Sequence, residues 1–367
     1  MINKIYTDMA PCLLAGPISE VGRELLQELK SLGTSPMATV LRTWAVIYLY
    51  NDMESVLAGD EDPVPKMVSS CSKIVNLSRN MKVLIESLDH ISFLDNENKQ
   101  QDNIDYDHFG NLFSNNVVQS FWEQPYKQLS QRLLLNDVSL DIFKDATIID
   151  IGCGSGRNAF VLKELGAKKV IGVDISKTGI ALAKARQKEL SISEGLEFFE
   201  ASAMDLPFDD NSFDLAFSMG VFHHTPSWQQ CFSEMYRVIK PQGTGLLMYL
   251  NEKPGGLFYD VIELLRCIVH SDNQIVIQKS FEILGINPTT IIKHLDPLLC
   301  DVNTRLTIRD IESQLDLMGA SNVRRFTRGT GADRVEKVYH GKPFAKEKFG
   351  IGEQRYIFTK NKLLPNR

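Results

Sequence analysis

Residues 147–158, TIIDIGCGSGRN, decide the fold. The first five of them, Thr147–Ile151, are mostly apolar and β-branched, which predicts a buried strand. Three glycines, Gly152, Gly154 and Gly156, follow directly. Glycines let the chain turn tightly after a strand and let a ligand approach the backbone without a Cβ atom in the way. We therefore predict a ligand site where this strand ends.

From residue 146 onward, β-branched segments alternate with amphipathic ones, which is typical of a doubly wound α/β sheet. Strands are predicted at residues 147–151, 169–175, 196–200, 213–219, 245–250, 322–328 and 354–360. Helices are predicted between them at residues 178–190, 228–239, 257–269, 275–284 and 307–318. The periodicity before this part is helical, with predicted helices at residues 20–29, 37–57 and 64–91. We expect an α-helical N-terminal domain over residues 1–100, a linker and lid segment over 101–145, and an α/β domain over 146–367 with an insertion at 252–305.

A carboxylate ends the second predicted strand of the sheet. Asp174 lies 18 residues beyond Gly156, and a carboxylate there can accept hydrogen bonds from both hydroxyl groups of a ribose. The glycine spacing distinguishes two kinds of nucleoside site. The dinucleotide pattern GxGxxG needs a third glycine where this chain has Arg157, whereas the observed pattern is DxGxGxG from Asp150. This spacing disfavours a nicotinamide-dependent dehydrogenase.

The ordered motifs of the chain resemble those of class I S-adenosylmethionine-dependent methyltransferases, in the branch of the ubiquinone and menaquinone biosynthesis enzymes. These motifs are Asp150–Gly156, Val173-Asp174, residues 206–214 (LPFDDNSFD), Phe222-His223-His224 and residues 237–243 (RVIKPQG). The resemblance covers roughly residues 140–250. It implies a seven-stranded Rossmann-like methyltransferase sheet with an antiparallel last strand, and S-adenosyl-L-methionine as the cofactor.

The resemblance also implies roles for individual residues. Asp150 and the glycine loop would hold the methionine part of the cofactor, Asp174 its ribose, and Ile175 one face of its adenine. The family usually has an aspartate near the adenine amino group where this chain has Ser202; Asp205 either substitutes for it or caps a turn. The expected cofactor-binding set is Asp150, Gly152, Cys153, Gly154, Gly156, Asp174, Ile175, Ser202, Ala203, Met204 and Met219.

Methyl transfer from a sulfonium needs an aligned nucleophile and exclusion of water, and an oxygen or carbon acid acceptor also needs a base. His223 and His224 follow the fourth predicted strand at the edge where ligands bind, so either is a candidate base. Alternatively, one histidine caps the next helix and the other packs against the cofactor loop. Tyr249, Asn251 and Tyr259 are expected to line the acceptor pocket, although aromatic side chains there also serve simple packing.

The connection between the last two strands, residues 329–352, is long for a hairpin. It carries Arg334 and Lys342, which we expect to pair with a carboxylate or phosphate of the acceptor. Residues 321–367 hold twelve Lys and Arg against four Asp and Glu, a bias that suits an anionic acceptor or only a solvated face.

Composition and charge limit the possible partners, the location and the metal content of the protein. The net charge of −6 and the lack of a base-flipping motif disfavour nucleic acid as a partner. No apolar segment is long enough to span a bilayer, and the first residues do not read as a signal peptide, so we expect a cytoplasmic protein that does not use a membrane. The six cysteines form no CxxC pair, so no metal site is expected.

Two functions therefore stay open at this point. The first is methyl transfer to a small-molecule, natural-product or peptide acceptor at an undetermined oxygen, nitrogen or carbon atom. The second is a catalytically degenerate binding or regulatory protein that keeps the methyltransferase fold. In either case, the helical N-terminal domain is the expected surface for a homodimer or a partner protein.

Overall fold

The computed structural model describes residues 14, 16–88, 119–192, 194–269, 298, 300 and 302–361. The predicted linker at 95–105, the aromatic lid segment at 106–113 and the predicted helix at 275–284 lie outside these residues. The chain divides into two compact units. A helical unit comprises residues 1–103, 255–300 and 341–350, and an α/β unit comprises residues 104–254, 301–340 and 351–367.

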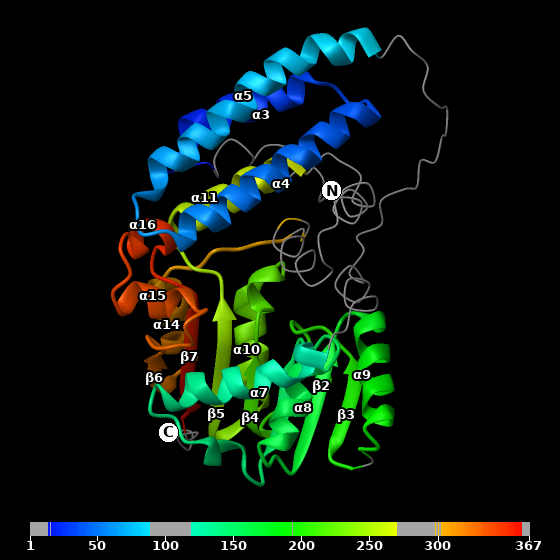
Figure 1. The fold of residues 1–367 in the computed structure, drawn as a ribbon. Coiled ribbons are helices and arrows are strands. Elements are labelled where there is room, and N and C mark those ends of the chain that lie inside the picture. The colour runs from blue at the N-terminus through cyan, green and yellow to red at the C-terminus, as the bar shows by residue number, and fades with distance from the viewer. Residues whose placement is uncertain are drawn as a thin grey trace. The chain divides into compact units, whose positions relative to one another are not determined.

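The helical unit contains α3 (Ser19–Ser31), α4 (Pro36–Ala58), α5 (Pro63–Leu88), α11 (Gly256–Val269) and α16 (Ala345–Phe349). Local sequence sets the start of α4, because the Ser35 side chain accepts a hydrogen bond from the Ala38 N–H and Pro36 occupies the first helical position. Helix α11 is apolar on most sides and packs against α3, α4 and α16, alongside α4 in Figure 1. The start of the predicted insertion therefore groups with the N-terminal helices.

The α/β unit is built on a seven-stranded sheet with the order β3-β2-β1-β4-β5-β7-β6. The strands are β1 (Thr147–Ile151), β2 (Lys169–Asp174), β3 (Leu196–Glu200), β4 (Phe213–Ser218), β5 (Ile239–Leu250), β6 (Ala320–Arg325) and β7 (Gln354–Lys360). Strands β1 to β5 are parallel, and β7 runs antiparallel to both β5 and β6. The predicted fold class is confirmed, including the antiparallel last strand.

Helices cover both faces of this sheet (Figure 1). One apolar core contains residues of α7 (Gln119–Leu134), α8 (Arg157–Glu164) and α9 (Lys177–Glu189), and the other contains residues of α10 (Trp228–Val238) and α14 (Ile308–Leu317). The strand order reverses between β1 and β4, and ligands of open α/β sheets bind at the carboxyl ends of the strands beside such a reversal. The fold thus places the glycine loop, which follows β1, at the expected ligand edge.

The predicted long hairpin connection between β6 and β7 holds two short helices, α15 (Arg334–Tyr339) and α16. Helix α15 lies in the α/β unit and α16 in the helical unit. Sequence periodicity did not predict them, since helices of five or six residues carry too little of a repeat to be recognised.

Candidate functional site

The glycine loop joins β1 to α8, and its three glycines all have positive φ: +76° at Gly152, +53° at Gly154 and +82° at Gly156. A Cβ atom at Gly152 would lie 2.2 Å from Val221 Cγ2, and one at Gly156 would lie 2.8 Å from Phe198 Cζ. A Cβ atom at Gly154 would meet no described atom within 4 Å. Gly152 and Gly156 therefore serve tight packing, whereas Gly154 leaves open space in which a ligand can approach the backbone.

Asp174, at the end of β2, ties the glycine loop to the neighbouring strand. Its Oδ2 accepts a hydrogen bond from the Gly154 N–H at 2.7 Å, and its Oδ1 accepts one from the Ser176 N–H at 2.8 Å. The next residue, Ile175, exposes 46% of its surface although it is apolar. Both predicted residues thus stand at the carboxyl edge of the sheet beside the loop.

Asp150 is the most unusual ionisable group at this edge. Its side chain is buried, and its Oδ2 has no hydrogen-bond partner among the residues that the structure describes. Burial raises the pKa of Asp150 to about 8, and the nearby charge of Asp174 adds to the rise, while a backbone hydrogen bond at Ala159 opposes it. A buried carboxylate oxygen without a partner is costly, so this position fits a ligand that brings a cation or a hydrogen-bond donor.

The other predicted cofactor residues surround the same loop or follow neighbouring strands. The Cys153 thiol is buried, and burial raises its pKa well above the usual range, so it is an inert packing group. The Ser202 hydroxyl accepts a hydrogen bond from the Met204 N–H at 3.2 Å, and Ser202 forms an isolated bridge with Asp205. Ala203 and Met204 are partly buried and pack against the core of the sheet. The Met219 sulfur accepts a weak hydrogen bond from the Asn158 Nδ2 at 3.7 Å.

His223 and His224 form a short 3-10 turn after β4, with ring centroids 4.0 Å apart. His223 is buried, and its Nδ1 has no partner among the described residues. Burial lowers the pKa of His223 well below its usual range, and His224 and Arg334 lower it further. A neutral imidazole that is so hard to protonate is a poor proton acceptor.

His224 is half-buried, and its Nδ1 lies 2.8 Å from the Val302 carbonyl oxygen. A carbonyl oxygen can only accept, so Nδ1 must carry the proton and Nε2 holds the lone pair. Val302 and the following residues are held beside the turn by a second hydrogen bond, from the Thr304 N–H to the His223 carbonyl at 2.8 Å. The geometry therefore distinguishes two histidines that sequence reasoning could not separate.

Tyr249 and Arg334 meet at the carboxyl end of β5. The Arg334 Nη2 donates to the Tyr249 hydroxyl oxygen at 3.2 Å, and the Tyr249 ring centroid lies 5.9 Å from that of His223. Arg334 also forms a two-pronged ion pair with Glu252, whose side chain is fully buried. Sequence reasoning missed Glu252, because a lone acidic residue after a strand carries no local signal of its partner.

Asn251 is buried beside this group and donates from Nδ2 to the Asn303 Oδ1. The Asn303 Nδ2 has no hydrogen-bond partner among the described residues. Asn303 was also missed, since it lies near the end of the predicted insertion, in a segment without periodicity. The structure thus brings together the predicted residues Tyr249, Asn251 and Arg334 with the histidine turn.

Two predicted acceptor residues lie in the helical unit rather than in the α/β unit. Tyr259 is buried within α11, and Lys342 is exposed between α15 and α16. The structure does not assign either residue to the sheet edge, so their roles stay predictions.

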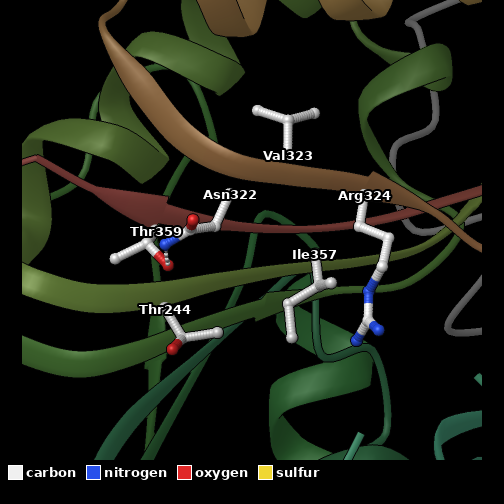
Figure 2. A pocket seen from close by; sticks show the side chains of 6 residues that line it. All are labelled: Thr244, Asn322, Val323, Arg324, Ile357 and Thr359. Atoms are coloured by element: carbon white, nitrogen blue, oxygen red, sulfur yellow. Dashed lines mark hydrogen bonds between the residues drawn. The ribbon is translucent and has the colours of Figure 1, made fainter. Parts of the chain in front are cut away.

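A pocket of about 410 Å³ lies on the sheet. Figure 2 shows the side chains that line it, those of Thr244, Asn322, Val323, Arg324, Ile357 and Thr359. Thr244 precedes the end of β5 by six residues, which is about 20 Å along a strand. No predicted site residue lines this pocket, so it is separate from the ligand edge.

Within the described ranges, no cluster of three or more His, Cys, Asp or Glu could hold a metal ion. The helices that the structure describes include none long and apolar enough to cross a membrane.

Part of the chain is similar to known proteins. Residues 149–247 match the family described as a methyltransferase domain. The chain is 36% identical over 99 residues to a demethylmenaquinone methyltransferase of Oceanobacillus iheyensis, covering 26% of this chain and 41% of that protein. It is 34% identical over 97 residues to a sterol 24-C-methyltransferase of Pneumocystis carinii, covering 26% of each. It is 42% identical over 110 residues to a chloroplastic 2-phytyl-1,4-beta-naphthoquinone methyltransferase of Arabidopsis thaliana, covering 29% of this chain and 42% of that protein.

A solved structure of a putative S-adenosyl-L-methionine-dependent methyltransferase from Methanococcus maripaludis is also similar, with a TM-score of 0.42 and 16% identity over 74% of this chain and all of that one. The matches span only about a quarter to a half of the length of the first curated relatives. Residues 149–247 are thus similar to a methyltransferase domain, and the relatives that match this part of the chain are quinone and sterol methyltransferases by name. The resemblance seen in the sequence motifs is confirmed for this part of the chain.

Proposed function

We propose that this protein transfers a methyl group from S-adenosyl-L-methionine to a small-molecule acceptor, at the carboxyl edge of its sheet. One observation carries the proposal: the unpartnered carboxylate oxygen of buried Asp150 lies under a glycine loop that is open at Gly154. A protein that used this fold only as a scaffold would gain nothing from a buried, unpaired carboxylate, which destabilises the fold. The degenerate-scaffold alternative is therefore disfavoured.

The residues at this edge fit the cofactor by their chemistry. Asp150 supplies an acceptor for a cationic amino group, the loop backbone at Gly154 admits a ligand, and the exposed face of Ile175 suits a flat apolar ring. Asp174 keeps the loop in shape through the Gly154 and Ser176 N–H groups, and a carboxylate at this strand end is the group that accepts hydrogen bonds from ribose hydroxyls. Bound S-adenosylmethionine would supply a methyl group already activated by its sulfonium.

We assign the role of general base to His224. Because Nδ1 donates to the Val302 carbonyl, Nε2 of the neutral ring can take a proton from an acceptor hydroxyl or an acidic C–H. The acceptor atom then forms its bond to the methyl carbon while the carbon–sulfur bond breaks, and the electron pair of that bond stays on sulfur. His223, buried and hard to protonate, packs behind it.

The names of the similar proteins specify demethylmenaquinone, a naphthoquinone and sterols, which are the first compounds to try as acceptors. A base beside the site is consistent with methylation of oxygen or carbon, which must lose a proton. The base is not needed for an acceptor that has no proton to lose.

Calorimetric titration with S-adenosylhomocysteine and, in parallel, NADH tests the proposal, in wild type and in Asp174→Ala. We expect wild type to bind S-adenosylhomocysteine and not NADH, and Asp174→Ala to lose that binding. Transfer of labelled methyl from S-adenosylmethionine to reduced naphthoquinones and sterols would then identify the acceptor. Failure of the wild-type protein to bind S-adenosylhomocysteine would support the degenerate alternative.

A further inference from the structure

Tyr249 and Arg334 form a hydrogen-bonded pair at the site that has no role in the proposed proton and methyl transfer. The Arg334 Nη2 donates to the phenol oxygen at 3.2 Å, and its Cζ lies 5.6 Å from the centroid of the phenol ring. Arg334 starts α15, so it approaches β5 from a different part of the chain. The pair is therefore formed only when the α/β unit is fully folded.

The guanidinium of Arg334 is held in place by buried carboxylates. Its Nε and Nη2 donate to the two oxygens of Glu252, both at 2.9 Å, and Glu353 Oε2 lies 3.7 Å from Nε. The side chains of Glu252 and Glu353 expose 0% and 2% of their surface. If Arg334 turned away to bind an acceptor anion, Glu252 would be left buried without its counter-charge. This pairing favours a positioning role for Arg334 over the anion-binding role expected from sequence.

The backbone of β5 is irregular where it presents Tyr249. In the pairing of β5 with β7, Leu247 stands opposite Tyr356 and Leu250 opposite Gln354, so β5 contains one extra residue. Such bulges turn a side chain out of its regular direction and often occur beside active sites. The bulge places the Tyr249 ring near that of His223, with centroids 5.9 Å apart.

We propose that Arg334 is a positioning residue that orients the Tyr249 phenol, and that Tyr249 donates a hydrogen bond to an uncharged hydroxyl or carbonyl oxygen of the acceptor. A hydroxyl oxygen that accepts from a guanidinium still has its own proton to donate. The positive charge of Arg334 is balanced by the carboxylate of Glu252. The Tyr249 hydroxyl therefore offers the acceptor a directional hydrogen-bond donor, without a net charge beside it. The acceptor class is thus a neutral molecule with a hydroxyl or carbonyl oxygen. This inference rests on the proposed function.

Tyr339 and Arg325 provide a matched control within the same unit. The Arg325 Nη1 donates to the Tyr339 hydroxyl oxygen at 2.7 Å, and its Cζ lies 5.3 Å from the ring centroid. This pair has the same chemistry as Tyr249 and Arg334, but Tyr339 is exposed. Tyr249→Phe and Tyr339→Phe each remove one phenol hydroxyl and keep the ring.

The test uses 2-naphthol as a neutral hydroxyl probe and naphthalene as its counterpart without the hydroxyl, both titrated by fluorescence into the full chain saturated with S-adenosylhomocysteine. We expect Tyr249→Phe to weaken 2-naphthol binding about three- to tenfold, which is the size of one neutral hydrogen bond, and to leave naphthalene binding unchanged. Tyr339→Phe should change neither. Equal 2-naphthol affinity in Tyr249→Phe and wild type, or no saturable 2-naphthol binding by wild type, would overturn the inference.

The positioning role of Arg334 needs a separate readout. The double variant Arg334→Gln with Glu252→Gln removes one positive and one negative charge together, so the net charge around Tyr249 is unchanged. In protein labelled with 13Cζ-tyrosine, this variant should shift the Tyr249 resonance. It should also weaken 2-naphthol binding as much as Tyr249→Phe does. An unmoved Tyr249 resonance would overturn this role. Binding of S-adenosylhomocysteine, measured first in each variant, separates the outcomes: its absence in wild type refutes the proposed function, whereas intact cofactor binding with unchanged 2-naphthol affinity refutes only the inference.

Discussion

Asp150→Asn should make the ligand-free protein more stable at neutral pH and at the same time weaken cofactor binding. The pKa of the buried Asp150 carboxyl is about 8, against about 3.9 for an aspartate in an unfolded chain. Between these two values the folded state keeps a proton that the unfolded state has released, so stability falls as pH rises through this window. The burial of Asp150 therefore destabilises the fold most strongly above pH 8.

The magnitude follows from the pKa difference. One pKa unit corresponds to about 1.4 kcal/mol, so release of this proton by the unfolded chain alone lowers the stability of the fold by about 4 kcal/mol between pH 4 and pH 7. The amide of Asn cannot ionise, but its buried donor without a partner costs about 1–3 kcal/mol. We expect Asp150→Asn to be less stable than wild type near pH 4.5 and more stable, by about 1–3 kcal/mol, at pH 7.

Urea unfolding of both proteins across this pH range measures the difference, and groups that titrate equally in both proteins cancel. Asp209→Asn, at an exposed carboxyl, serves as the control and should follow wild type. Parallel stability curves for Asp150→Asn and wild type would refute the reasoning about the buried charge. The same variant should bind S-adenosylhomocysteine about 10- to 100-fold more weakly, because a hydrogen bond to a charged group is lost; unchanged affinity would refute the cofactor role of Asp150.

Asp174→Ala removes the acceptor of two backbone N–H groups and should lower S-adenosylhomocysteine affinity at least tenfold in calorimetry, with Asp209→Ala as an unaffected control. Gly154→Ala should lose cofactor binding and lower stability by about 1–2 kcal/mol, the strain of an alanine at positive φ, whereas Gly152→Ala, whose Cβ would also overlap Val221, should lower the melting temperature further; similar melting of the two variants would contradict this contrast. In 15N-labelled histidine spectra, His224 should show the Nδ1–H tautomer, and an Nε2–H tautomer would exclude it as the proposed base. His224→Gln should lower the methyl-transfer rate about 10²- to 10⁴-fold with S-adenosylhomocysteine binding unchanged.

The sequence by itself determined the architecture of the sheet and the conformation of the glycine loop. Thr147–Ile151 and Gln354–Lys360 are strands with the predicted bounds, because short runs of apolar, aromatic and β-branched residues favour a strand locally. The three loop glycines were predicted from spacing alone and all have positive φ, since only glycine adopts such a backbone without strain. The conformation of the strand and glycine loop is thus determined locally, within the twelve residues 147–158.

Tertiary structure alone decided which groups meet at the acceptor side. The tautomer of His224 depends on Val302, 78 residues away, and the orientation of Arg334 depends on Glu252, 82 residues away. Likewise, α11 groups with the N-terminal helices although it follows β5 in the chain. No local sequence pattern predicts such contacts, because each requires two distant segments to pack together. Whether a buried charge or hydrogen-bond donor stabilises or destabilises the fold depends on the partner that this packing brings to it.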